Sequence, residues 1–220
     1  MLVNISEITA STLPFSTHRT YIVTNSVKPV TPRGEQTRQK LLEAAELEFG
    51  EKGFHASSVS SITQQAGVAQ GTFYIYYSSK EDILRALVDE LNRRLRRSLR
   101  EATETSGDRL RMEKRGIEHF LEFAREHKNL YRIMMQCLFV DEAAYRRYYE
   151  TLTNVYAKRL KDAQEAGEIK RGDPMAQAWA LIGLNYFLGL NYSVWNDAPP
   201  PQEVMETVLD FINHGLAPER

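Results

Sequence analysis

The stretch Ser57–Asp82 (SSVSSITQQAGVAQGTFYIYYSSKED) constrains the fold of this chain most strongly, because it sets the ends of two short helices. Ser58 is a suitable N-cap for a helix over residues 59–65. Gly67 is where that helix should end, since glycine accepts the positive φ of a helix C-cap. A second helix is expected over residues 69–76, followed by an S-x-x-D pattern that opens a third. The first helix has apolar residues at helical spacing, namely Val59, Ile62 and Ala66.

Two short helices around a glycine turn form a helix-turn-helix, whose second helix enters the DNA major groove. Gln and Thr side chains on that helix suit adenine and thymine edges, and glycine lets the backbone approach closely. Lys80, at the next helix start, suits a phosphate. The alternative is a plain αα-hairpin with half-buried tyrosines. The predicted DNA contacts are Thr37, Ser58, Gln70, Gly71, Thr72, Tyr74, Tyr76 and Lys80.

Residues 37–84, above all AGVAQGTFYIYYSSKEDIL at 66–84, resemble the DNA-binding domain of the TetR/AcrR family of transcriptional regulators. The resemblance implies an all-α protein of about nine helices, with an N-terminal three-helix helix-turn-helix domain and a C-terminal ligand-binding and dimerisation bundle. It also implies a dimeric repressor that leaves a palindromic operator when a small molecule binds. Three residues depart from the family's usual choices: Ala69 for Ser or Thr, Tyr77 for Phe, and Ser78 for Lys, Pro or Gly.

The charge balance does not by itself suggest a DNA-binding protein. The net charge is −1, and residues 33–82 hold five basic side chains against seven acidic ones. We therefore expect DNA binding to depend on a few placed cations, helix N-termini and the avidity of a dimer, with acids such as Glu43, Glu46 and Glu51 turned away from the operator.

Three segments are predicted: a flexible arm over residues 1–32, a DNA-binding domain over 33–79, and a ligand-binding and dimerisation domain over 80–220. No apolar run approaches the roughly 18 residues of a membrane span, so no membrane association is expected. The sequence shows no signal-peptide pattern and one cysteine, Cys137, which together favour a cytoplasmic protein.

A long helix is expected over residues 80–105, with a leucine stripe on one side. It carries a dense cluster of cations, for which a solvated face paired with acids is favoured over a nucleic-acid contact. The cluster consists of Arg93, Arg94, Arg96, Arg97 and Arg100.

The next three helices, near residues 109–127, 130–139 and 142–166, are rich in aromatic residues and Met, which line adaptable apolar pockets. A fully packed core is the alternative. A small hydrophobic or aromatic effector is predicted. An acyl thioester is one candidate, because some members of the TetR/AcrR family sense such compounds. The candidate pocket residues are His119, Phe120, Phe123, Arg132, Met135, Gln136, Tyr156, Asn185 and Tyr186.

A helix over residues 174–196 is apolar around nearly its whole circumference, so it has to be covered on all sides. We expect a second copy of the chain to cover one side, together with a last helix over residues 202–214. The predicted homodimer interface contains Trp179, Ile182, Gly189, Tyr192, Val208, Phe211 and Ile212.

No catalytic, metal or cofactor site is predicted. The five histidines lack the spacing of a helical metal site, and no P-loop, G-x-S-x-G or G-x-G-x-x-G motif occurs. Two other classes remain open, a helical adaptor dimer without DNA binding and an enzyme that uses the apolar cavity. The favoured reading is a ligand-responsive DNA-binding regulator that is not an enzyme.

Overall fold

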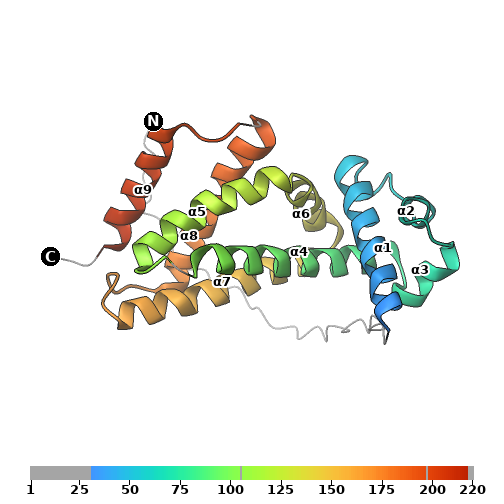
Figure 1. The fold of residues 1–220 in the computed structure, drawn as a ribbon, viewed down its shortest axis with the longest axis horizontal. Helices are drawn as coiled ribbons and strands as arrows, with labels where there is room; N and C mark the ends of the chain where they lie inside the picture. Colours follow the sequence, from blue (N-terminus) through green and yellow to red (C-terminus); the bar gives the residue numbers. More distant parts are fainter. Residues whose placement is uncertain (1–30, 105, 197, 218–220) are drawn as a thin grey trace, which may run out of the picture.

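The computed structural model describes residues 31–104, 106–196 and 198–217, and within them the chain is all-α (Figure 1). Residues 1–30 of the predicted arm lie outside this range. The helices are α1 (Pro32–Glu51), α2 (Val59–Ala66), α3 (Gln70–Tyr76), α4 (Lys80–Thr103), α5 (Arg109–Glu126), α6 (Asn129–Val140), α7 (Glu142–Glu165), α8 (Pro174–Gly189), the π-helical η1 (Leu190–Trp195) and α9 (Gln202–Leu216).

Helices α1, α2 and α3, here called the three-helix unit, form one end of the elongated molecule (Figure 1). Their inward side chains are fully buried or nearly so, because the 3.6-residue period of each helix puts its large apolar residues on one face. The largest are Leu41, Phe49, Ile62, Phe73 and Tyr77.

Helix α4 leaves the three-helix unit and runs through the rest of the molecule, here called the helical body (α4–α9). Its leucine stripe is buried as predicted up to Leu95, and Leu99 is half-buried. One apolar core continues from Phe73 in α3 through Leu84 and Leu87 in α4 to Ile133 in α6 and Tyr148 in α7. The three-helix unit is therefore packed directly onto the body.

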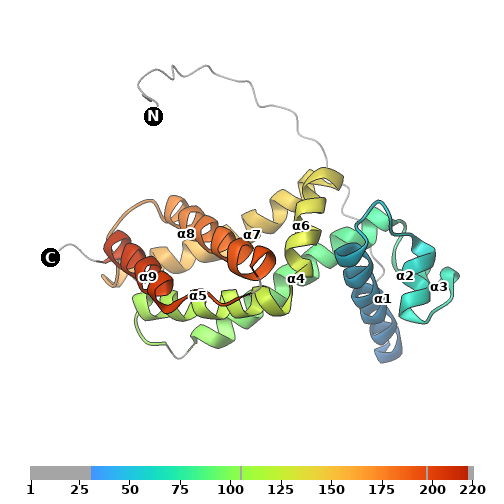
Figure 2. The ribbon, with the colours of Figure 1, turned by 90° about the horizontal axis from the view of Figure 1, so that it is seen from above.

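Helix α6 joins the helical body to α1, as Figure 2 shows. The Gln136 amide donates to the Phe49 carbonyl at 3.0 Å and accepts from the backbone N–H of Phe54. The Arg132 guanidinium donates to the Gly50 carbonyl at 3.2 Å. These bonds cap carbonyls at the C-terminal end of α1, where the helix leaves them without internal partners.

The eighth helix differs from the expected single helix over residues 174–196. Its α-helical part ends at Gly189 and a π-helical segment follows to Trp195. The Tyr131 hydroxyl donates to the Tyr186 carbonyl at 3.2 Å beside this junction, and an inserted side-chain donor is a recognised cause of helix irregularity. Within the residues described, no helix combines the length and the apolarity that crossing a membrane requires.

Candidate nucleic-acid interface and effector cavity

The turn between α2 and α3 has the geometry that the sequence pattern predicts. The Ser58 hydroxyl accepts from the Ser61 amide at 3.0 Å, and the Ser61 hydroxyl accepts from the Ser58 amide at 3.0 Å, which forms a reciprocal capping box. Gly67 ends α2 with a φ of 66°, where a Cβ atom would be strained. The Val68 amide then donates to the Thr63 carbonyl and closes the turn.

Helix α3 presents a nearly uncharged surface to solvent. Gln70 and Gly71 are exposed, Thr72 is half-buried, and Tyr74 is 56% exposed, while Phe73 is fully buried beneath them. Neither α2 nor α3 contains an acidic or basic residue. The acids that outnumber bases in this region therefore do not lie on the two helices that would meet DNA.

Ile75 is an exposed residue of α3 that the sequence reasoning missed. Its side chain is 60% exposed. The helical period that buries Phe73 and Tyr77 places Ile75 roughly opposite them, so the signal was present in the pattern. An exposed apolar side chain on a reading helix can contact a thymine methyl group.

Three predicted phosphate contacts lie differently from the expectation. The Lys80 ammonium donates to the carbonyls of Phe54 and Ser57 at 2.6 and 2.8 Å and sits 4.3 Å from the centre of the Phe54 ring. It therefore ties the loop after α1 to α4. Tyr76 is half-buried against the core, and the Thr37 hydroxyl donates to the Arg33 carbonyl of its own helix.

Several acids of the three-helix unit are neutralised by ion pairs. Glu35 pairs with Arg38 at 2.6 Å, and Glu48 pairs with Lys52 at 2.6 Å. Glu46 pairs with Arg94 of α4 at 2.6 Å. This pairing reduces the repulsion that the composition implies between this unit and a phosphate backbone.

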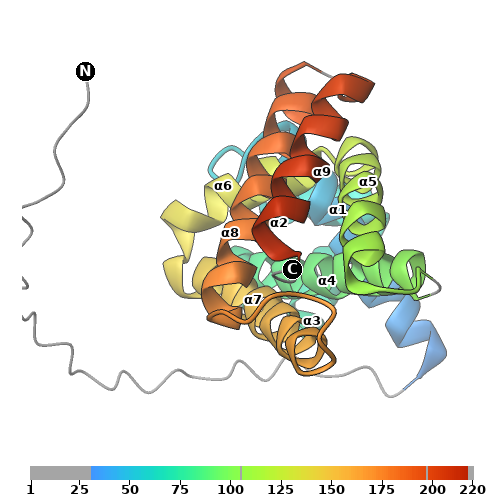
Figure 3. The same cartoon turned by 90° about the vertical axis from the view of Figure 1, so that its left-hand side faces the viewer.

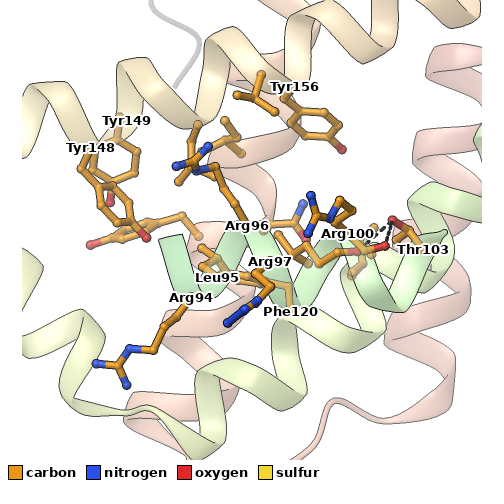
Figure 4. Close-up of a pocket in the computed structure, with 18 of the residues that line it drawn as sticks. Arg94, Leu95, Arg96, Arg97, Arg100, Thr103, Phe120, Tyr148, Tyr149 and Tyr156 are labelled. Carbon is orange, nitrogen blue, oxygen red and sulfur yellow. Dashed lines mark hydrogen bonds between the residues drawn. The ribbon is translucent and has the colours of Figure 1, made fainter. Parts of the chain in front are cut away.

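A cavity of about 630 Å³ lies between α4, α5, α6, α7 and α8. This volume falls within the range of small-molecule sites in proteins. One part of its wall is apolar and aromatic, with Leu95, Phe120, Tyr148, Tyr149 and Tyr156 among its side chains (Figure 4). The open alternative of a fully packed core is therefore wrong, and the helical body contains a cavity that can hold a ligand.

The other part of the cavity wall is cationic. Seven arginines line it, against two acids, Glu90 and Glu113. The α4 cluster is in part the solvated, acid-paired face that the sequence predicts: Arg93 and Arg97 are 54% and 71% exposed and pair with Glu90 and Glu101, and Arg94 pairs with Glu46. The sequence did not show that all five of its arginines also border the cavity. The seven are Arg93, Arg94, Arg96, Arg97, Arg100, Arg109 and Arg159.

A buried ionic group borders the same cavity. Arg109 pairs with Glu113, and the Tyr156 hydroxyl donates to the other oxygen of that carboxylate. The side chains of Arg109 and Glu113 are 7% and 4% exposed. Burial and the adjacent Glu113 carboxylate raise the pKa of Tyr156 well above its ordinary value, so the hydroxyl stays protonated and donates.

Four of the nine predicted pocket residues line the cavity: Phe120, Tyr156, Asn185 and Tyr186. The other five do not, because each points from the other face of its helix. Arg132 and Gln136 bind α1, as described above. Met135 is 51% exposed, His119 shares a hydrogen bond of 2.6 Å with Ser98, and Phe123 packs in the core against His127.

Helices α8 and α9 lie side by side at the end of the molecule remote from α3 (Figure 3). Among the predicted interface residues, Trp179 is 45% and Phe211 is 72% exposed, while Tyr192 and Val208 are half-buried. Three predicted interface residues face inward instead: Ile182 lines the cavity, Gly189 packs against Tyr131, and Ile212 is in the core. The exposed residues that were missed are Phe187 and Trp195.

Comparison with known proteins places these features in a family. Residues 41–87 match the model of bacterial regulatory proteins of the tetR family. The transcriptional activator FasR of Mycolicibacterium smegmatis is 29% identical over 190 residues, which cover 84% of this chain and 85% of FasR. The fatty acid metabolism regulator protein of Bacillus subtilis is 29% identical over 147 residues, covering 65% of this chain and 76% of that protein.

A solved structure supports the same assignment at the level of the fold. The fatty acid degradation regulator FadR from Bacillus halodurans superposes with a TM-score of 0.71 at 20% identity, covering 84% of this chain and 96% of FadR. The helix-turn-helix sequence and the arrangement of the helices thus agree. The chain is a TetR-family, DNA-binding helix-turn-helix transcriptional regulator.

Proposed function

We propose that this regulator is a homodimeric repressor that leaves a palindromic operator when an amphipathic anion binds in its cavity. Residues 33–79 would form the DNA-binding domain, and residues 80–220 would bind the effector and form the dimer. The observation that carries the proposal is the placement of an exposed, uncharged α3 at one end of α4 and of a cavity along the same helix.

The DNA contacts are assigned to the exposed side of α3. Gln70 can form two hydrogen bonds with adenine, Gly71 leaves open space for close approach, and Tyr74 projects from the same helix. Ser58 caps the start of α2, the other helix of the motif, where phosphates bind well. Dimeric helix-turn-helix proteins place two such helices about one DNA turn apart, hence a palindromic site.

The homodimer is assigned to the outer surface of α8, η1 and α9. Phe187, Trp195, Phe211 and Trp179 are large apolar side chains exposed at this end of the molecule. Large exposed apolar side chains that gather on one part of a surface mark interaction sites, and aromatic residues dominate binding energy in interface cores. A second copy related by a two-fold axis would cover the same residues on both protomers.

The effector is assigned from the two halves of the cavity wall. Leu95, Phe120 and Ile182 offer an apolar surface for a hydrocarbon chain, and the arginines of α4 offer donors for a carboxylate or phosphate. Fatty acids and their acyl thioesters combine these two parts. Two similar proteins are fatty acid regulators by name, which supports the same class here.

Release requires that the effector bind the conformer with low DNA affinity more tightly than the conformer that fits the operator. The cavity is bounded by α4, which begins directly after the helix-turn-helix, and by residues of α6, which contacts α1. A ligand that separates these helices would change the distance between the two α3 helices of a dimer. Since α3 pairs must match successive major grooves, the operator would then be lost.

The DNA assignment predicts the effect of a Gln70→Ala, Tyr74→Ala double variant. We expect its affinity for a palindrome from its own upstream region to fall by about 100-fold or more, because each base contact contributes about 1–3 kcal/mol and a dimer makes each contact twice. Fluorescence anisotropy at two salt concentrations measures this. Asn154→Ala, an exposed change on α7, is the control and should bind as wild type does. Equal affinity of both variants would reject these contacts.

The dimer assignment predicts the behaviour of Phe187→Glu combined with Phe211→Glu. Two charges per protomer in an apolar interface should leave the protein monomeric at micromolar concentration, because a buried charge without a partner is strongly unfavourable. Analytical ultracentrifugation measures the mass. Phe139→Glu serves as the control, since Phe139 is 86% exposed but belongs to α6. A double variant that stays dimeric places the interface elsewhere.

The effector assignment predicts that filling the cavity abolishes release. Gly116 borders the cavity, and a Cβ atom there meets only Thr103, at 3.8 Å, so the larger side chain of Gly116→Leu would extend into the open space. This variant should keep its operator affinity while dodecanoate no longer lowers it. Gly116→Ala, which adds a single carbon, should respond like wild type. Release of the leucine variant at wild-type dodecanoate concentrations would show that the ligand binds outside this cavity.

A further inference from the structure

Arg94 occupies a position between the cavity and the three-helix unit. It borders the cavity, yet its Nη2 atom lies 2.6 Å from Oε2 of Glu46 on α1. Figure 4 shows the Arg94 side chain reaching away from Arg96, Arg97 and Arg100. The side chains of Arg94 and Glu46 are 29% and 15% exposed, so solvent screens this pair only in part.

The guanidinium of Arg94 has donor capacity that its present partners do not use. Its Nε atom is buried and forms no hydrogen bond within the described residues. The second acid nearby, Glu90 on the same helix, lies 3.9 Å from that atom and accepts a 2.6 Å hydrogen bond from Arg93 instead. A buried N–H donor without an acceptor is unfavourable, and an anionic oxygen supplied by a ligand would satisfy it.

We propose that Arg94 binds the anionic group of the effector and that this group replaces the Glu46 carboxylate as its partner. The exchange rests on the proposed function, because it makes the ion pair between α4 and α1 part of the operator-binding conformer. When the effector's carboxylate or phosphate takes the guanidinium, Glu46 loses its partner on α4. Helix α1 is then held to the body by the remaining contacts alone.

Competition for one guanidinium explains how ligand charge acts on DNA affinity. A ligand shifts a conformational equilibrium only by its difference in affinity for the two conformers. An anion that must displace Glu46 binds more weakly where the pair is intact and more tightly where it is broken. Conversely, the hydrogen bonds of Arg132 and Gln136 to α1 involve no cavity residue, so they respond to ligand size and not to ligand charge.

The first test needs no effector. Glu46→Gln and Arg94→Met should each lower operator affinity by about fivefold, the upper range for a pair that is partly exposed. Glu43→Gln is the matched control, because it removes the same charge from an exposed position of α1 whose hydrogen bond is to Gln39 of the same helix. The double variant Glu46→Gln, Arg94→Met should be no weaker than either single variant. Wild-type affinity of Glu46→Gln would overturn the proposal.

The second test uses the DNA-free protein and three probes: dodecanoate, dodecanoyl-coenzyme A and methyl dodecanoate. Calorimetry should show that Glu46→Gln binds an anionic probe about fivefold more tightly than wild type does, since the competing carboxylate is gone. Methyl dodecanoate should bind both proteins equally. The anionic probe that responds identifies the source of the charge, a carboxylate or a phosphate. Unchanged affinity for both anionic probes, or an equal gain for the ester, would overturn the exchange.

Failure of this inference is distinguishable from failure of the proposed function. A wild-type protein that binds no operator, or that no probe releases, removes the repressor model itself. Suppose instead that dodecanoate or its thioester releases the wild-type protein from the operator, while Glu46→Gln leaves the DNA and probe affinities unaltered. The repressor model then stands, and the proposed role of Arg94 is rejected.

Discussion

Arg109→Met is expected to lower the free energy of unfolding by about 3–5 kcal/mol, because it leaves the buried Glu113 carboxylate without its cation. Both side chains are more than nine-tenths buried, and the Tyr156 hydroxyl also depends on the same carboxylate. Desolvating a charge is unfavourable, and only the partner in place offsets that cost. Urea denaturation at a fixed protomer concentration measures the change, since the stability of the proposed dimer would depend on concentration.

The matched control replaces both ions and the hydroxyl together. Arg109→Met, Glu113→Leu and Tyr156→Phe combined should recover most of the lost stability, since a buried ion pair replaced by apolar groups is often close to neutral. Comparing this triple variant with Arg109→Met separates the effect of an unpaired Glu113 carboxylate from the effect of altered packing. If the triple variant is as unstable as Arg109→Met alone, the effect comes from altered packing at the cavity and not from the unpaired charge.

Gly50→Ala is expected to destabilise the protein by about 1–3 kcal/mol by overpacking the contact between α1 and α6. A Cβ atom at position 50 would lie 2.1 Å from Cγ and 2.6 Å from Cβ of Asn129. The Asn129 Cβ is fixed by the backbone of α6, so the two helices have to move apart. Thermal unfolding by circular dichroism measures the lowered midpoint.

The same substitution tests how the body holds the three-helix unit. Arg132 and Gln136 bind carbonyls next to position 50, so separation of α1 from α6 should lengthen these hydrogen bonds. We expect operator affinity to fall along with stability. Gly215→Ala in α9 is the control, because nothing lies within 4 Å of its added Cβ and alanine favours helix. Equal midpoints for the two variants would show that Asn129 adapts without strain.

The helix-turn-helix was predictable from sequence because its determinants are local. The caps at Ser58 and Ser79 and the positive φ of Gly67 each depend on residues within about one helical turn of one another. Helix periods likewise predicted which side of α4 carries the buried leucines. Where a pattern of this length agrees with the geometry of one motif, the chain has few other ways to satisfy its backbone and bury its apolar face.

The sequence could not predict what the polar side chains of α4 and α6 contact, because their partners lie far away in the chain. Gln136 and Arg132 looked like pocket residues, but they bind carbonyls of α1 that lie 87 and 82 positions earlier. The α4 arginines were expected on a solvated face paired with acids, and the sequence did not show that they also border a cavity whose other walls come from α5, α6, α7 and α8. A periodic pattern tells which face of a helix is apolar, but the element that covers each face is decided by how all the helices pack.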